Sequence, residues 1–106
     1  MTYRITSEAE LQASIVLLLT RDEWCFERER ILTPSERIDF LVEGRIGIEV
    51  KIKRSPSALH RQLLRYAETS TIEALLVVVT KPLLLDIPDV LHAKPVRAVF
   101  LSGAVF

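Results

Sequence analysis

Two kinds of pattern in the sequence predict an α/β fold, in which helices pack on a mixed β-sheet. Apolar residues recur at helical spacing near residues 11–19 and 59–66, whereas residues 46–53 alternate strictly between apolar and polar side chains. A fully apolar run at residues 74–79 is typical of a buried strand. The chain has 106 residues, of which 49% are hydrophobic, so we expect residues 1–106 to form a single domain with one core.

The composition excludes several classes of protein. The single cysteine, Cys25, leaves no internal disulfide and no cysteine-based zinc site, and it fits a reducing compartment. The apolar runs are far shorter than the roughly 20 residues that a membrane helix needs. Charges precede any apolar stretch at the N-terminus. We therefore expect no membrane partner and a cytoplasmic location, in a bacterial, archaeal or virus-infected cell.

The expected elements follow in the order helix, three strands, helix, strand, short helix, strand. The first helix begins after Thr6 or Ser7 as its N-cap and ends near residues 20–22, and the second covers residues 58–68. The strands are expected at residues 24–31, 37–42, 46–53, 74–80 and 96–101, and the short helix at residues 87–92. The connection from the third strand through the second helix to the fourth predicts a parallel pair.

The turn between the second and third strands brings two acidic residues together. If residues 43–45 form a three-residue loop, the paired positions sum to 88, and Val42 faces Ile46. Asp39 then faces Glu49 on the neighbouring strand, with Cβ atoms about 5 Å apart.

Opposed like charges destabilise a sheet unless something neutralises them. A divalent cation would do so, and hard oxygen ligands favour Mg²⁺, Mn²⁺ or Ca²⁺, with the backbone carbonyl of Val50 as a third ligand. Lys51 lies two residues beyond Glu49 on the same face, where an ammonium group can position or deprotonate water. The alternative is a solvated face on which Lys51 itself neutralises both acids.

These residues resemble the signature of the PD-(D/E)xK nuclease superfamily. Asp39 is followed, after nine residues, by Glu49-Val50-Lys51 within RIDFLVEGRIGIEVKIK, and RQLLRYAE follows on the next helix. The resemblance covers roughly residues 6–80 and is to the small virus-type replication-repair nucleases and the archaeal-type Holliday junction resolvases. It implies a restriction-endonuclease-like α/β/α core around a central mixed β-sheet.

The resemblance also implies roles for individual residues. Asp39, Glu49 and the Val50 carbonyl would hold one or two Mg²⁺ or Mn²⁺ ions, and Lys51 would orient or activate the attacking water. Glu8 begins an E-x-x-L-Q pattern of these nucleases and would join the metal shell.

A second motif of the family lies on the expected second helix. Gln62, followed by Tyr66, resembles the Gln-x-x-x-Tyr motif that packs near the site, so Gln62 is counted with the catalytic residues. On the first helix, Glu10 is about 200° from Glu8, so at most one of these two acids faces the site.

The local charge predicts contact with nucleic acid although the net charge is zero. Residues 45–66 carry one acid, Glu49, and six basic residues, namely Arg45, Lys51, Lys53, Arg54, Arg61 and Arg65. The phosphate contacts expected from this segment are Lys53, Arg54, Arg61 and Arg65. The alternative for the same charges is a solvated surface.

The function expected from these features is metal-dependent hydrolysis of DNA phosphodiester bonds by an endonuclease of DNA repair or recombination. No base-reading motif is recognised, so we expect selection of junction, flap or branched DNA rather than of a base sequence. We expect no organic cofactor, and a homodimer whose interface includes residues 96–106. The alternatives are a catalytically silent DNA-binding or assembly module of the same fold, and an unrelated interaction domain with a chance motif.

Overall fold

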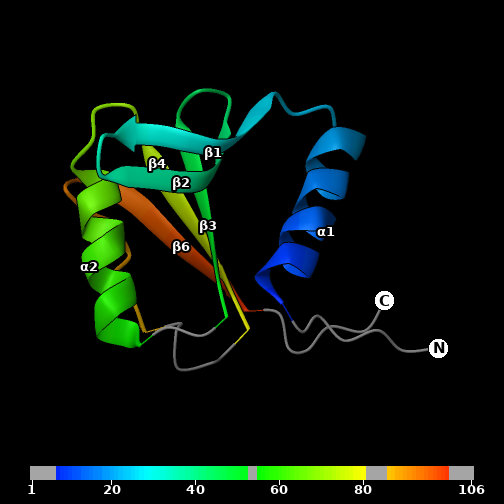
Figure 1. The fold of residues 1–106 in the computed structure, drawn as a ribbon. Helices are drawn as coiled ribbons and strands as arrows, with labels where there is room; N and C mark the ends of the chain where they lie inside the picture. Colours follow the sequence, from blue (N-terminus) through cyan, green and yellow to red (C-terminus); the bar gives the residue numbers. More distant parts are fainter. Residues whose placement is uncertain (1–6, 53–54, 81–85, 101–106) are drawn as a thin grey trace.

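The computed structural model describes residues 7–52, 55–80 and 86–100, and these residues form six strands and two helices. The elements are α1 (Glu8–Arg21), β1 (Phe26–Thr33), β2 (Glu36–Val42), β3 (Ile46–Lys51), α2 (Pro56–Ala67), β4 (Ala74–Val79), β5 (Val90–Leu91) and β6 (Lys94–Phe100). The strands form one sheet in the order β1-β2-β3-β4-β6-β5, with α1 and α2 on either side of it (Figure 1). The expected α/β fold with a central mixed sheet is therefore confirmed.

The sheet is mixed because its two halves are connected differently. Strands β1, β2 and β3 form antiparallel pairs through tight turns, whereas α2 connects β3 to its parallel partner β4. Strand β6 is parallel to β4 and antiparallel to β5. The parallel pair that the sequence predicts across the second helix is confirmed.

Both helices begin at a serine that caps the first turn. Ser7 Oγ accepts a hydrogen bond from the Glu10 N–H at 3.1 Å, and Ser55 Oγ accepts one from the Ala58 N–H at 3.1 Å. Pro56 follows Ser55 in the first turn, where its missing N–H costs no helical hydrogen bond. Helix α2 therefore begins two residues before the expected position. Neither described helix is long and apolar enough to cross a membrane.

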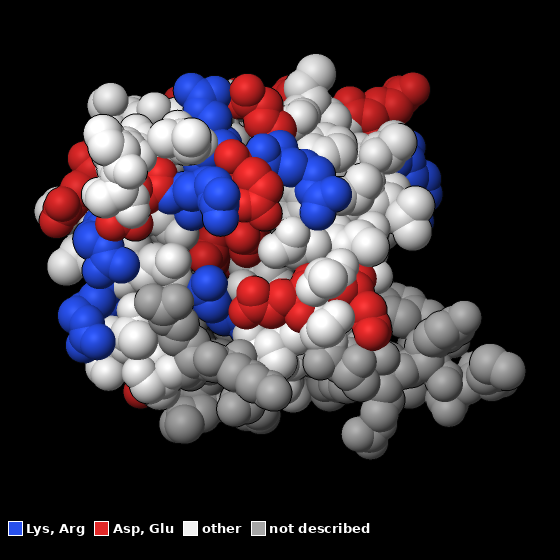
Figure 2. Space-filling model, viewed as in Figure 1, with Lys and Arg blue, Asp and Glu red and all other residues white. Residues whose placement is uncertain are grey.

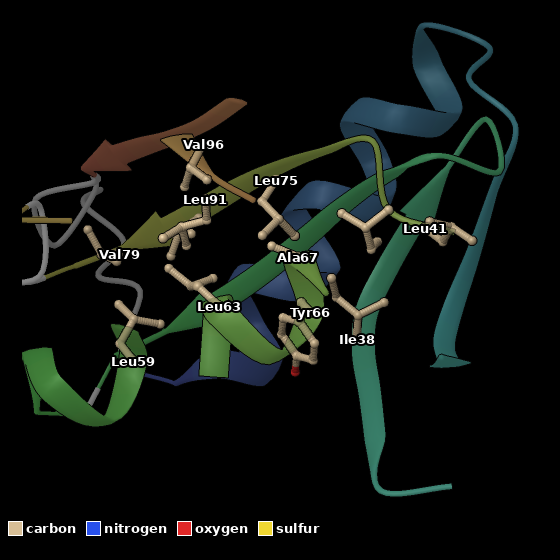
Figure 3. Packing of buried hydrophobic residues seen from close by; sticks show 12 residues of the cluster. Ile38, Leu41, Leu59, Leu63, Tyr66, Ala67, Leu75, Val79, Leu91 and Val96 are labelled. Carbon is tan, nitrogen blue, oxygen red and sulfur yellow. The ribbon is translucent and has the colours of Figure 1, made fainter. Parts of the chain in front are cut away.

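The core consists of two apolar layers, one on each face of the sheet. Figure 3 shows the layer under α2, where Leu59, Leu63, Tyr66 and Ala67 pack on residues of β2, β4, β5 and β6. On the other face, Leu11 and Ile15 of α1 pack on residues of β2, β3 and β4, namely Phe40, Val42, Ile48, Val50 and Val78. Strand β3 lies between the two layers, so its side chains are buried on both faces.

The short helix predicted at residues 87–92 is wrong. Val90 and Leu91 form strand β5 and pair with Pro95 and Lys94 of β6. The two residues between these strands, His92 and Ala93, have φ angles of 49° and 62°. Two consecutive residues with positive φ form the turn of a two-residue hairpin, so the segment folds back as a strand pair instead of winding into a helix.

Candidate functional site

The pairing of β2 with β3 opens at the two acidic residues. Backbone pairing follows the predicted register from the turn as far as Phe40 and Ile48, and stops there. Beyond that point the Asp39 N–H donates to Glu49 Oε1 at 3.2 Å, and the Val50 N–H donates to Asp39 Oδ2 at 2.8 Å. Each carboxylate thus accepts a hydrogen bond from the opposite strand, and the two side chains lie next to each other in the opening.

Lys51 is the third member of this cluster. It lies on the same face of β3 as Glu49, as the alternating sequence predicts. Its Nζ lies 2.8 Å from Glu49 Oε2, and the two residues are only 9% and 2% exposed. Charges this deeply buried are stable only when they are paired and hydrogen-bonded. The solvated face that the sequence left open as an alternative does not apply to Glu49 and Lys51, although their direct pairing agrees with the neutralising role of Lys51.

Tyr66 and Gln62 of α2 approach the cluster from the adjacent layer. The Tyr66 hydroxyl lies 2.8 Å from the Arg37 carbonyl and 3.2 Å from Glu49 Oε2, and it can donate to either. Gln62 Nε2 donates to the Tyr66 hydroxyl at 2.8 Å. Gln62 therefore acts on the carboxylate through Tyr66, and its Oε1 atom is buried without a partner among the described residues.

Glu8 is the acid of the first helix that lies at this end of β3. Its Oε1 accepts a hydrogen bond from the Ile52 N–H at 3.4 Å, and its charge helps to raise the pKa of Asp39. Glu10 is exposed on another face of α1. The structure therefore brings Glu8, rather than Glu10, to the cluster.

The cluster holds two carboxylates whose ionised forms are less favourable here than in water. Burial raises the pKa of Glu49 to about 7, with a further contribution from Asp39 and opposition from Lys51. Burial also raises the pKa of Asp39, against the hydrogen bond from Val50 and the charge of Lys51. Both side chains are therefore stabilised by a bound proton or by a nearby cation.

The oxygen atoms of the cluster suit a hard divalent cation. Asp39 Oδ1 and Glu8 Oε2 accept no hydrogen bond from the described residues, and carboxylate oxygens are the ligands that Mg²⁺ and Mn²⁺ prefer. As they stand, no three His, Cys, Asp or Glu side chains of the described residues lie close enough together to hold an ion. Lys51 would compete with a cation for Glu49 Oε2. The Val50 carbonyl stays a predicted ligand.

The basic residues predicted to contact phosphates differ in whether an acidic side chain already compensates their charge. Arg65 Nε lies 2.6 Å from Glu36 Oε1, so its charge is compensated, whereas Arg61 is exposed and has no acidic partner among the described residues. Lys53 and Arg54 lie outside the described residues.

Strands β1 and β2 also carry arginines that the sequence did not single out as site residues. Arg28 donates to Gln12 Oε1 at 3.2 Å, while Arg30 and Arg37 are ion-paired with Glu27 and Glu29. Figure 2 shows basic and acidic side chains interleaved on the face of the molecule that includes these strands. In the sequence, the alternation of acids and arginines at residues 27–30 is the pattern from which these ion pairs could have been predicted.

Comparison with protein-family models, with curated proteins and with solved structures gives no match. The fold and the site define an α/β protein with a carboxylate–lysine cluster at the point where two antiparallel strands separate. Glu49 and Lys51 of this cluster are buried, and Asp39 is partly buried.

Proposed function

We propose that this chain is a metal-dependent DNA endonuclease, a small PD-(D/E)xK domain with a restriction-endonuclease-like core. The observation that carries the proposal is the buried cluster in the opening between β2 and β3. It joins Asp39, Glu49 and Lys51 through hydrogen bonds and a 2.8 Å ion pair. Asp39 and Glu49, ten positions apart and on different strands, meet here with Lys51, and this supports the proposal.

Each side chain of the cluster has a role that follows from its chemistry. Asp39 and Glu49, with Glu8 beside them, would hold Mg²⁺ or Mn²⁺. A cation bound there supplies Lewis-acid stabilisation of the phosphoryl oxygens and makes water a better nucleophile. The Lys51 ammonium stabilises the negative charge that develops on the phosphate, and Tyr66 holds Glu49 in place.

The substrate class follows from what surrounds the cluster. The described residues form two helices, and both pack against the sheet rather than extending from it as a separate base-reading element. Exposed arginines, among them Arg28 and Arg61, offer contacts to phosphates instead. We therefore propose cleavage that depends on DNA structure, such as a junction, flap or branch, rather than on base sequence.

A cleavage assay tests the proposal. Labelled four-way junction, flap, single-stranded and linear duplex DNA are incubated with the protein and Mg²⁺, Mn²⁺ or EDTA. We expect cleavage with either metal, none with EDTA, and none by Glu49→Gln. Glu73→Gln, which changes an exposed acid at the start of β4, is the matched control and should cleave like the wild type. If the wild type cleaves none of these substrates with either metal, the proposal is contradicted.

One observation favours a second candidate, a catalytically silent DNA-binding or assembly module. The Lys51 ammonium already compensates Glu49 directly, so the cluster has a stable ion pair without a metal. In that case DNA binding would be the same in Mg²⁺ and in EDTA, and no substrate would be cut.

A further inference from the structure

Arg28 of β1 is held in place from two sides, by a residue of α1 and by a residue of β2. Its Nη2 donates to Gln12 Oε1 of α1 at 3.2 Å, and its Cζ lies 5.6 Å from the centroid of the Phe40 ring. Phe40 is the backbone partner of Arg28 on β2 and directly follows Asp39. A hydrogen bond and a ring face together restrict the orientation of an exposed guanidinium group.

These two partners orient Arg28 without neutralising its charge. Gln12 and Phe40 are uncharged, and no carboxylate of the described residues lies within ion-pair distance of Arg28. The neighbouring arginines differ in this respect, because Arg30 is paired with Glu27 at 2.7 Å and Arg37 with Glu29 at 3.0 Å. Arg28 therefore keeps a full positive charge and free N–H donors.

The position of Arg28 connects this charge to the cluster. Its partner Gln12 lies one helical turn after Glu8, on the same face of α1, so their Cβ atoms are about 6 Å apart. Glu8 in turn accepts the hydrogen bond from Ile52 at the end of β3. An anionic group bound by Arg28 would therefore lie about one turn of α1 away from the Glu8 carboxylate.

We propose that Arg28 is a phosphate-binding residue that holds the backbone of the DNA strand on the α1–β1 side of the cluster. A guanidinium group with two parallel N–H donors matches a phosphate, and one that is already oriented loses less conformational entropy on binding. The inference rests on the proposed function and adds to it the path of the substrate strand, which runs over β1 and α1.

The test compares Arg28→Gln with Arg45→Gln. Arg45 is also exposed and lacks an acidic partner among the described residues, but it lies in the turn at the other end of the β2–β3 hairpin. KM and kcat for the preferred DNA substrate are measured over a series of KCl concentrations. For Arg28→Gln we expect KM to rise about tenfold with little change in kcat. The slope of log KM against log[KCl] should fall by about one. Arg45→Gln should match the wild type, and Arg28→Lys should recover most of the salt dependence.

Different results separate this inference from the proposed function. If the wild type cleaves and Arg28→Gln retains both its KM and its salt dependence, the inference alone is overturned. A raised KM with an unchanged salt dependence would show lost packing rather than a lost phosphate contact, and it would also overturn the inference. If the wild type cleaves no DNA, the proposed function is overturned and the inference falls with it.

Discussion

A buried lysine and two carboxylates form an arrangement in which no member is stable alone. Removing Glu49 and Lys51 from water costs several kcal/mol for each ion, and only their pairing and hydrogen bonds offset this. The raised pKa of Glu49 shows that Lys51 does not offset the burial completely. A bound divalent cation would supply the missing compensation.

Lys51→Ala tests the role of the lysine. We expect cleavage to fall by a factor of about a hundred or more, because the ammonium group that stabilises the charge on the phosphate is lost. DNA binding should persist, because the exposed arginines are unchanged. Cleavage and binding are measured on the same labelled DNA, with Lys94→Ala, a lysine near the β5–β6 turn, as the control. Cleavage at the wild-type rate would remove Lys51 from the mechanism.

The residues of the cluster were predictable because they lie on two adjacent strands joined by a short turn. Strict alternation places Glu49 and Lys51 on one face of β3, and the turn then sets Asp39 opposite Glu49. The partners of Tyr66 and Arg65 were not predictable in this way. They depend on where α2 packs against β2, which brings together residues 29 positions apart, such as Arg65 and Glu36.

At the scale of single elements, β3 is constrained on both faces. Gly47 lies where a Cβ atom would overlap Ile38 Cδ1 and come within 2.9 Å of Ile72 Cδ1 and 3.0 Å of Leu75 Cδ2. The absence of a side chain lets these three residues close the layer under α2.

Gly47→Ala should therefore destabilise the fold through overpacking. We expect the free energy of unfolding to fall by about 1–3 kcal/mol, as measured by urea denaturation. The overlapping atoms are ends of side chains, so the layer can adjust and the protein should still fold. Glu73→Ala, an exposed change at the start of β4, should have a smaller effect. A Gly47→Ala variant as stable as the wild type would show that this layer has room for a methyl group.

The two hairpins show why one turn was predictable and another was not. The β2–β3 turn contains Gly44, with φ of 69°, between two alternating strands. The β5–β6 turn uses His92 and Ala93 at positive φ, where the usual Asn and Gly are missing. Without that signal, and with only two residues in β5, the sequence at residues 87–92 could not be distinguished from a short helix.

At the scale of the whole molecule, the cluster links global stability to pH. The pKa of Glu49 is about 7 in the folded protein, against an ordinary value of 4.5. At pH values between these two pKa values, Glu49 is protonated in the folded protein and ionised in the unfolded chain. Stability therefore falls as pH rises through this range, and the loss is complete above pH 7.

Glu49→Gln should remove this part of the pH dependence. As the pH rises from 4.5 to about 7, the folded pKa of Glu49, the free energy of unfolding of the wild type should fall by about 3 kcal/mol relative to that of Glu49→Gln. The free energy of unfolding is measured in EDTA at several pH values for both proteins. Parallel pH profiles would show that Glu49 titrates at its ordinary pKa.

Metal binding at the cluster is the claim on which the whole account depends, and calorimetric titration with Mn²⁺ tests it most directly. The wild type and Glu73→Gln should bind the ion with the same heat. Glu73 is exposed and directly precedes β4, at the end of that strand away from the cluster. Asp39→Asn keeps the shape of the side chain but removes its charge, so binding should be lost or strongly weakened. An Asp39→Asn titration identical to that of the wild type would contradict the account, as would a wild type that binds no Mn²⁺.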